Sequence, residues 1–358
     1  MIRVVVRRSR DISYLSQDLA RELDGVREGP AHWWLRGEGD LASARDVARV
    51  LSTSERSAVV GYDLIVAAPR SISTLVAIDA ENAPAVVAAH RQAVAHTLDY
   101  LEQRALVVRD RRGGDDVEVG ARWAHALSFT HGINRHGEPH VHDHVLVGAR
   151  PQGHSNVLDS RALFAHVAAA DALYRSSLRA GVSHTTPYVA WRSFEGVEHV
   201  AGLDEGYRVL WGGHHADRGD KRHWTRDEVR QRWASDLARF EEHGTLDLPE
   251  RSRVELDEHA FRATFEGRDV VARRHVVEAW ANAAVFGRGA VQVAASVDDW
   301  YPALRDSRGV RETTVSVTHA RMIASTRERG PRPLDVAGND AWRQRSRSLS
   351  REGLERSR

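Results

Sequence analysis

The chain of 358 residues contains no cysteine, and this absence excludes several kinds of chemistry. Without thiols there are no disulfide bonds, no thiolate nucleophile and no cysteine-ligated zinc. Any metal ion must therefore be held by histidine or carboxylate. No apolar run approaches the roughly 18 residues of a membrane-spanning helix, and the N-terminus lacks the hydrophobic region of a signal peptide. We therefore expect no membrane insertion and a cytoplasmic location.

Lysine is nearly absent too. Lys221 is the only one, so arginine carries almost all the positive charge. Arginine suits bidentate phosphate contacts, although a GC-rich coding sequence explains the same bias equally well. The stretch from Ala341 holds six arginines against two glutamates, and we expect it to be disordered and to bind nucleic acid weakly. No G-x-x-x-x-G-K-[ST] motif occurs, which excludes a P-loop motor in this chain.

The pattern of hydrophobic residues predicts both helices and strands. Because the two are segregated rather than strictly alternating, we expect an α+β fold with an antiparallel sheet. The expected strands cover Ile2–Arg7, Gly61–Ala68, Ala105–Val108, Val117–Gly120, Trp123–Thr130 and His140–Gly148. The expected helices cover Asp11–Leu23 after a cap at Ser9, a segment from Pro69, Ala85–Arg104, Ser160–Arg179 and Asp269–Ala284.

Three histidines have a spacing that suits one metal ion. His131 is followed eleven and thirteen residues later by His142 and His144. The polar run Asn134–Pro139 between them is typical of a hairpin loop. Side chains alternate faces along a strand, so His142 and His144 share a face. If the strands pair with residue numbers that sum to 273 or 275, His131 lies directly opposite His142 or His144, at about 4.5–5.5 Å. One hairpin therefore suffices for a three-histidine site.

Other interpretations of this cluster remain open. The chain has 20 histidines, so a chance grouping is a real alternative. His140 lies on the same face as His142, about 6.8 Å away along the strand, and competes as a ligand. A metal hydrolase of the cupin kind would need a glutamate three or four residues beyond the His-x-His pair. Residues 145–149 read Val-Leu-Val-Gly-Ala, without one.

Five blocks occur in a characteristic order. They are Tyr14 in the first expected helix, Trp33-Trp34-Leu35-Arg36-Gly37-Glu38-Gly39-Asp40-Leu41, Gly61–Ser73, the histidine hairpin with Glu138-Pro139, and Val157–His166 leading to Tyr174-Arg175. With these blocks the chain resembles the MobF-class (TrwC/TraI-like) conjugative relaxases of the HUH endonuclease superfamily. The resemblance is good over about residues 1–240 and thinner to about Arg327. The family's helicase region does not follow, which implies a relaxase without a helicase, or a fragment of a longer one.

The resemblance also implies a division of the chain. Residues 1–245 would form the HUH catalytic domain, an antiparallel sheet flanked by helices in a palm-like fold. Residues 246–327 would form a C-terminal relaxase extension of mixed helices. Residues 328–358 would be the disordered, arginine-rich tail.

The implied activity is metal-dependent, site- and strand-specific nicking of single-stranded DNA at an origin of transfer, for conjugative transfer of a plasmid or integrative element. Tyr14 would attack the phosphodiester and form a 5′-phosphotyrosyl link. A divalent metal ion held by His131, His142 and His144 would assist. We expect Mg or Mn in use, with Zn or Ni as alternatives. A type IV secretion coupling protein is a further implied partner.

Other residues take roles by the same resemblance. Asp63 would be either the base that assists the tyrosine or a partner that orients a ligand histidine. DNA binding is expected from Trp33, Trp34, Arg36 and Arg70, because single strands need arginine for phosphates and aromatic faces for bases. Arg70 also begins a helix whose N-terminus favours phosphate. For the tryptophans, burial in the core is the plain alternative.

Two departures from the family pattern bear on the mechanism. Many members have two pairs of tyrosines near the N-terminus, whereas Tyr14 is the only tyrosine before Tyr62. Any second strand-transfer step that needs another tyrosine is therefore in question. Arg70 replaces the usual lysine. A rolling-circle replication initiator would use the same nucleophile chemistry, and a non-catalytic DNA-binding module would tolerate both Tyr14→Phe and metal removal.

Overall fold

The computed structural model describes residues 1–9, 21–23, 26–28, 32–33, 51, 58–186, 189–194, 197–200, 203, 211, 224–241, 256–268, 270–300 and 314–316. All of them fall within one compact unit, Met1–Val317. Tyr14, Trp34 and Arg36 lie outside the described residues, as does the tail from Ala341. Within the described part, no helix is long and apolar enough to cross a membrane.

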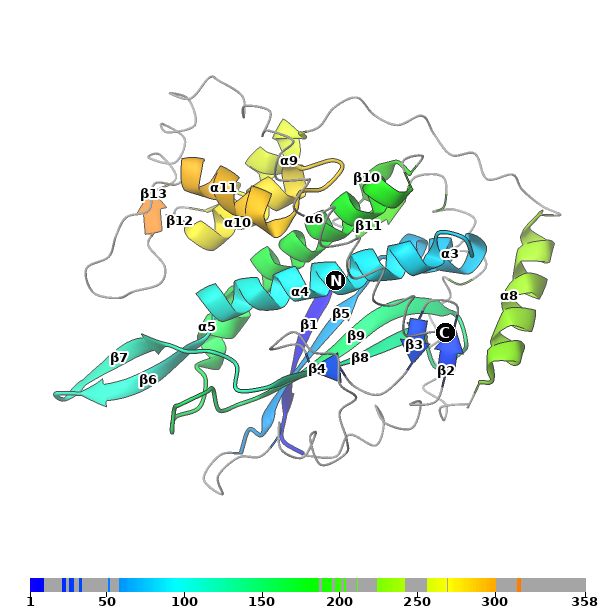
Figure 1. Cartoon of the computed structure of the whole chain (residues 1–358). Coiled ribbons are helices and arrows are strands. Elements are labelled where there is room, and N and C mark those ends of the chain that lie inside the picture. The colour runs from blue at the N-terminus through cyan, green and yellow to red at the C-terminus, as the bar shows by residue number, and fades with distance from the viewer. Residues whose placement is uncertain are drawn as a thin grey trace, which may run out of the picture. The chain divides into compact units, whose positions relative to one another are not determined.

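A five-stranded antiparallel sheet forms the centre of the fold (Figure 1). Its order is β1-β5-β9-β8-β4, where β1 is Ile2–Arg7, β5 is Gly61–Ala67, β9 is Pro139–Gly148, β8 is Ala126–Ile133 and β4 is His32–Trp33. Every neighbouring pair in this sheet is antiparallel. The longest strands, β8 and β9, are consecutive in the chain, and β9 lies between β8 and β5. The predicted α+β class with an antiparallel sheet is confirmed.

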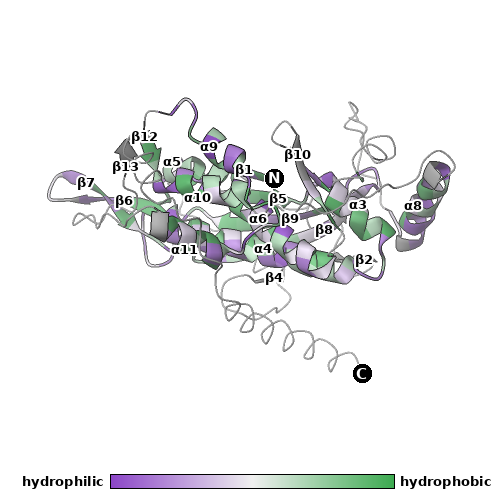
Figure 2. Ribbon diagram, turned by 90° about the horizontal axis from the view of Figure 1, so that it is seen from above, coloured by the Kyte–Doolittle hydropathy of each residue, from purple (hydrophilic) through white to green (hydrophobic). Residues whose placement is uncertain are grey.

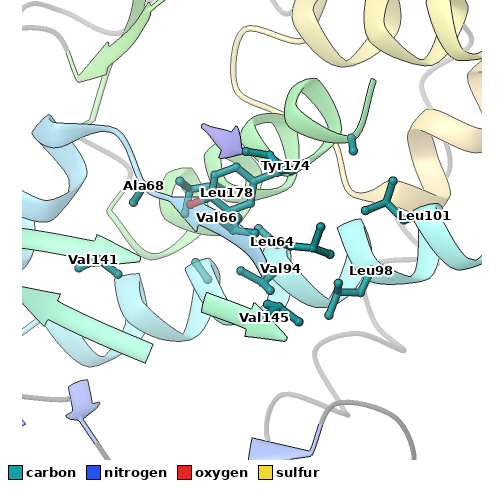
Figure 3. Packing of buried hydrophobic residues seen from close by; sticks show 14 of the residues in the cluster. Leu64, Val66, Ala68, Val94, Leu98, Leu101, Val141, Val145, Tyr174 and Leu178 are labelled. Atoms are coloured by element: carbon teal, nitrogen blue, oxygen red, sulfur yellow. The ribbon is translucent and has the colours of Figure 1, made fainter. Parts of the chain in front are cut away.

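Helices cover one face of the sheet. They are α3 (Arg70–Ile78), α4 (Ala83–Arg104), α5 (Ser160–Ala165) and α6 (Val167–Thr185). The core lies between the sheet and the two long helices. Figure 3 shows Leu64 and Val66 of β5 and Val145 of β9 facing Val94 of α4 and Leu178 of α6. Because side chains alternate along a strand, the intervening residues of β5 and β9 point to the opposite face of the sheet.

Smaller elements surround this centre. Two-stranded ribbons pair β2 (Arg21–Leu23) with β3 (Val26–Glu28), β6 (Val107–Arg112) with β7 (Asp115–Gly120), β10 (Trp191–Phe194) with β11 (Val197–Val200), and β12 (Val270–Ala272) with β13 (Thr314–Ser316). The far end of the β6–β7 ribbon is hydrophilic (Figure 2). The other helices are α8 (Arg226–Glu241), α9 (Glu258–Ala263), α10 (Arg273–Ala283) and α11 (Ala290–Trp300).

Three expected helices differ in the structure. The helix expected to end at Leu23 is wrong at that end, because Arg21–Leu23 pairs with Val26–Glu28 as strands. The Asp-Gly dipeptide between these strands is the sequence that favours a two-residue hairpin. The helix expected from Asp269 begins instead at Arg273, after Val270–Ala272 pairs with Thr314–Ser316. The Ser160–Arg179 helix is divided at His166 and continues to Thr185.

Candidate metal centre

The β8–β9 hairpin brings His131, His142 and His144 together. His131 pairs directly with His142, one of the two partners that the sequence allowed. The ring centroids are 5.0 Å apart for His131 and His142, and 5.4 Å apart for each of the other two pairs. One nitrogen from each ring lies within 4.8 Å of those of the other two. This separation is short enough for one ion to contact all three rings.

Hydrogen bonds fix the orientation of two of these rings. His142 Nδ1 donates to the backbone oxygen of His140 at 2.8 Å. His144 Nδ1 donates to both carboxylate oxygens of Asp63, each at 3.0 Å. A neutral imidazole that donates from Nδ1 keeps the lone pair of Nε2 for a metal ion. The residues present therefore fit a divalent metal ion.

Asp63 reaches His144 from the neighbouring strand. In the β5–β9 register Ile65 pairs with His144, so Asp63 lies two residues away on the same face. Asp63 is buried, at 2% exposure. A carboxylate on the second nitrogen of a ligand histidine holds the ring and increases its basicity. The resemblance implied that Asp63 is either the base for the tyrosine or the partner that orients a ligand histidine. This contact with His144 favours the second role.

The electrostatic environment keeps His142 neutral. Burial, followed by the neighbouring His144, lowers the pKa of His142 to about 3. At neutral pH the ring therefore carries no proton that a metal ion would have to displace. Among the described residues, His140 does not join the converging set, although its ring centroid lies 4.5 Å from that of His142. Burial first, and then the nearby His142 and Arg70, lower the pKa of His140 well below its ordinary value.

Arg70 approaches the hairpin from the start of α3. Its Nη1 lies 3.4 Å from the backbone oxygen of Pro139 and 3.7 Å from a carboxylate oxygen of the buried Glu138. The Arg70 side chain is 46% exposed, so it is accessible to a ligand. Nearby, the backbone N–H of Val141 donates to Ser73 Oγ at 3.0 Å, which fastens α3 to the beginning of β9.

The loop between β8 and β9 is ordered by its own side chains. Asn134 Oδ1 accepts from the backbone N–H groups of His136 and Glu138, at 2.9 and 3.1 Å. The Asn134 amide donates to Glu138 Oε2 at 2.6 Å. Gly137 has a φ of +74°, in the left-handed region that favours glycine. The sequence predicted this loop from its polar, glycine-containing composition.

Helix α8 and the residues before it contact the same loop. Trp224 Nε1, Trp233 Nε1 and Arg232 Nη1 donate to the backbone oxygens of residues 135, 137 and 136 respectively. Arg232 also lies over the Trp224 ring, 5.3 Å from its centroid. The hairpin that carries all three histidines is therefore held at its tip by a segment about 90 residues further along the chain.

A family model named TrwC relaxase matches residues 16–212, more than half of the chain. The chain belongs to the TrwC relaxase family. It is a DNA relaxase, which is a DNA-nicking enzyme. The match begins two residues after Tyr14, so it does not include the expected nucleophile. No curated protein sequence matches the chain significantly.

Solved structures share the relaxase fold. The chain is 17% identical to TrwC complexed with a 27-mer DNA comprising the recognition hairpin and the cleavage site, with a TM-score of 0.53. It is 16% identical to the metal-bound structure of conjugative relaxase TrwC in complex with oriT DNA, with a TM-score of 0.53. It is 18% identical to a copper-bound complex, with a TM-score of 0.54. Each match covers 70% of this chain and 100% of the other.

The expected DNA-binding residues of the relaxase fall in different parts of the structure. Arg70 lies beside the hairpin, as described above. Trp33 belongs to the edge strand β4, where its backbone pairs with Leu127. Trp34 and Arg36, like Tyr14, lie outside the described residues. The DNA-binding roles of all four residues stay predictions.

Sequence reasoning missed two features of this site. One is the docking of α8 on the hairpin loop, which no local sequence pattern predicts. The other is Asp143, a fully buried carboxylate between His142 and His144. Strand alternation places Asp143 on the same face as Val141 and Val145, and a charged residue in an apolar row was the available signal.

Proposed function

We propose that this relaxase nicks one strand of DNA at a specific site of an origin of transfer, through a covalent tyrosyl intermediate that depends on a divalent metal ion. The observation that carries the proposal is the convergence of His131, His142 and His144 on one face of the hairpin. Solved TrwC structures in complex with oriT DNA, among them a metal-bound and a copper-bound one, support it. The process served would be conjugative transfer of a plasmid or integrative element.

Tyr14 is the proposed nucleophile. Its phenolic oxygen would form a new bond to the scissile phosphorus while the bond to the 3′ oxygen breaks. The phenolic proton leaves, and the departing 3′ oxygen takes up a proton. One phosphodiester replaces another, so the step needs no ATP and can reverse. An unperturbed tyrosine has a pKa near 10 and is scarcely ionised at neutral pH, so the transfer needs assistance.

The described residues would supply that assistance by binding and positioning. His131, His142 and His144 would hold the metal ion, and Asp63 would keep His144 turned toward it. When bound, the ion supplies Lewis-acid stabilisation of the charge on the phosphate oxygens. Arg70, partly exposed at the start of α3, would contact a phosphate of the bound strand. Because three imidazoles leave room for phosphate and water oxygens, we propose Mg or Mn as the working ion, with Zn or Ni as alternatives.

The proposed place of action is the cytoplasm, where origin DNA would be available. A type IV secretion coupling protein remains a predicted partner. Residues 1–245 are the proposed catalytic domain, 246–327 its extension, and 328–358 the tail. A binding measurement between the relaxase and a coupling protein of the same genetic element would test that partner.

The covalent link is the decisive test. Purified protein is incubated with Mn²⁺ or Mg²⁺ and single-stranded oligonucleotides tiled across the surrounding DNA, and products are analysed on denaturing gels and by mass spectrometry. We expect an adduct on Tyr14 that disappears in Tyr14→Phe. The control is Tyr100→Phe, which removes a hydroxyl on α4 that contacts His166 on the helix-covered side. This variant should still form the adduct.

Other outcomes separate the alternatives. Tight oligonucleotide binding without any adduct would indicate a DNA-binding module and end the catalytic proposal. An adduct made by a protein that supports plasmid replication but not transfer would indicate a rolling-circle initiator.

A further inference from the structure

The carboxylate of Asp143 occupies an unusual position in β9. It lies between His142 and His144, and strand alternation turns it to the helix-covered face of the sheet. Asp143 is 0% exposed. Its Oδ2 accepts from Ser128 Oγ of β8 at 2.6 Å, and its Oδ1 lies 3.2 Å from His90 Nε2 of α4. Both carboxylate oxygens therefore have a partner from a different element.

The contact continues through His90 into a second helix. His90 is also 0% exposed, and its Nδ1 lies 2.8 Å from the hydroxyl of Tyr174 on α6. In a neutral ring, Nε2–H donates to Asp143 while Nδ1 accepts from Tyr174, so each donor meets one acceptor. We refer to these four residues as the buried chain: Ser128, Asp143, His90 and Tyr174. It joins β8, β9, α4 and α6, and Figure 3 shows Tyr174 among the core side chains.

Stability alone does not account for a buried carboxylate here. Taking a charge out of water costs several kcal/mol, and a pair of apolar residues of similar size is often as stable or more so. The flanking positions on this face are filled by Val141 and Val145, both buried. On this face of β9 the charged Asp143 therefore stands between two valines. In the sequence it is the residue between His142 and His144. A rotation of β9 about its own axis would move the Asp143 carboxylate away from Ser128 Oγ and His90 Nε2.

We infer that the buried chain positions the metal centre from behind the sheet. Fixing Asp143 fixes the backbone of β9 at the residue between His142 and His144, and so fixes the directions of both ring-bearing Cα–Cβ bonds. Asp143 is a positioning residue and does not touch the ion. On the face of the sheet that carries the three histidines, Asp63 and the backbone of His140 orient the rings of His144 and His142. On the helix-covered face, the buried chain orients strand β9. This inference rests on the metal centre of the proposed function.

The test compares two buried carboxylates. Asp143→Asn keeps the size of the side chain but places an amide donor where an oxygen now accepts. Glu198→Gln is the matched control, because Glu198 of β11 is 4% exposed and forms an ion pair with Arg179 of α6, and neither residue belongs to the β8–β9 hairpin. Metal affinity is measured by titration with Mn²⁺ and Co²⁺, the visible absorption of the Co²⁺ form is recorded, and thermal unfolding is followed without metal.

We expect Asp143→Asn to weaken metal binding at least about tenfold and to change the Co²⁺ spectrum, as loss of an outer partner does at other metal sites. Glu198→Gln should lower the unfolding temperature and leave both metal readouts unchanged. Should Asp143→Asn fail to fold, Ser128→Ala and Tyr174→Phe provide smaller changes. Ser128→Ala, which acts on Asp143 directly, should weaken metal binding more than Tyr174→Phe, which acts through His90.

The results distinguish this inference from the proposed function. A wild-type protein that binds no metal would overturn the metal centre and this inference together. A wild-type protein that binds metal, with Asp143→Asn or Ser128→Ala equal to it in affinity and spectrum, would overturn the inference alone. A loss of affinity that follows the unfolding temperature equally in Glu198→Gln would also overturn it, because the buried chain would then act only on stability.

Discussion

His142 and His144 each use Nδ1 for a protein acceptor, and this decides what the remaining nitrogen can do. The acceptor of His142 is a backbone oxygen two residues away, whereas that of His144 is a carboxylate from another strand. The first contact is local. The second depends on how β5 pairs with β9, so single-residue chemistry at this site depends on strand register.

Asp63→Ala should lower metal affinity by about 10- to 100-fold, because His144 loses the partner that holds its ring. Asp63→Asn, which retains one acceptor oxygen, should lower it less. Metal titration and single-turnover cleavage are measured on the same variants. If Asp63 acts instead as the base for Tyr14, Asp63→Asn will lose cleavage while binding metal as tightly as the wild type.

The lowered pKa of His142 predicts a pH dependence of stability for the metal-free protein. In the unfolded chain this ring takes up a proton below its ordinary pKa of 6.5, but in the folded chain only near 3. The unfolded state therefore binds more protons between these values, and stability should fall as the pH falls through that window, by at most about 1.4 kcal/mol per pH unit for this group. Unfolding temperatures of wild type and His142→Gln at several pH values check it. If the unfolding temperatures of wild type and His142→Gln depend on pH in the same way, the pH dependence does not come from His142.

Among the elements, the β8–β9 hairpin is held from several directions. β5 pairs along β9, Ser73 of α3 accepts from Val141, and the α8 segment donates to the loop backbone. The hairpin itself could be predicted from alternation and loop composition. Its attachments join segments far apart in the sequence, so local periodicity carries no information on them.

Gly137→Ala should destabilise the hairpin tip. A Cβ there would lie 2.7 Å from Trp224 Cε2, on backbone with a φ of +74°. Gly153→Ala is the matched control, since its φ is +73° with nothing within 4 Å of the added carbon. Backbone strain of this kind costs about 1–3 kcal/mol, and Gly137→Ala should cost more than the control because of the clash. Equal losses in denaturant unfolding would mean that Trp224 does not constrain the loop.

For the whole molecule, the sheet separates two environments. The helix-covered face holds the main apolar core, and the opposite face of β8 and β9 carries the metal histidines. The three histidines therefore lie on the side of the sheet away from the main core. The buried chain crosses from the core side to the strand that bears the ligands.

The arginine-rich stretch 341–358 gives a prediction for the complete chain. Its deletion should flatten the dependence of single-stranded DNA affinity on salt, by about 0.7 in the logarithmic slope for each arginine that contacts a phosphate. Cleavage at low salt should persist. Binding titrations over a range of salt concentrations measure the slope, and an unchanged slope would show that these arginines do not contact the strand. An inactive truncation would mean that the tail is part of the fold.

The sequence by itself determined the features that depend on neighbouring residues. The absence of cysteine limits metal ligands to histidine and carboxylate, and the period of two in a strand places His142 and His144 on one face. Loop composition predicted the hairpin, and two pairing registers would place His131 opposite His142 or His144. The end of the first expected helix was wrong because an Asp-Gly turn signal outweighed helical periodicity at Leu23.

Only the tertiary structure decided which histidine pairs with His131 and which residues support the three histidines. Strand pairing brings Asp63 to His144, helix packing brings His90 to Asp143, and α8 docks on the loop. These contacts join residues between about 50 and 100 positions apart. Such partners depend on how the whole chain packs and hydrogen-bonds. The alternation of residues within one strand therefore cannot predict them.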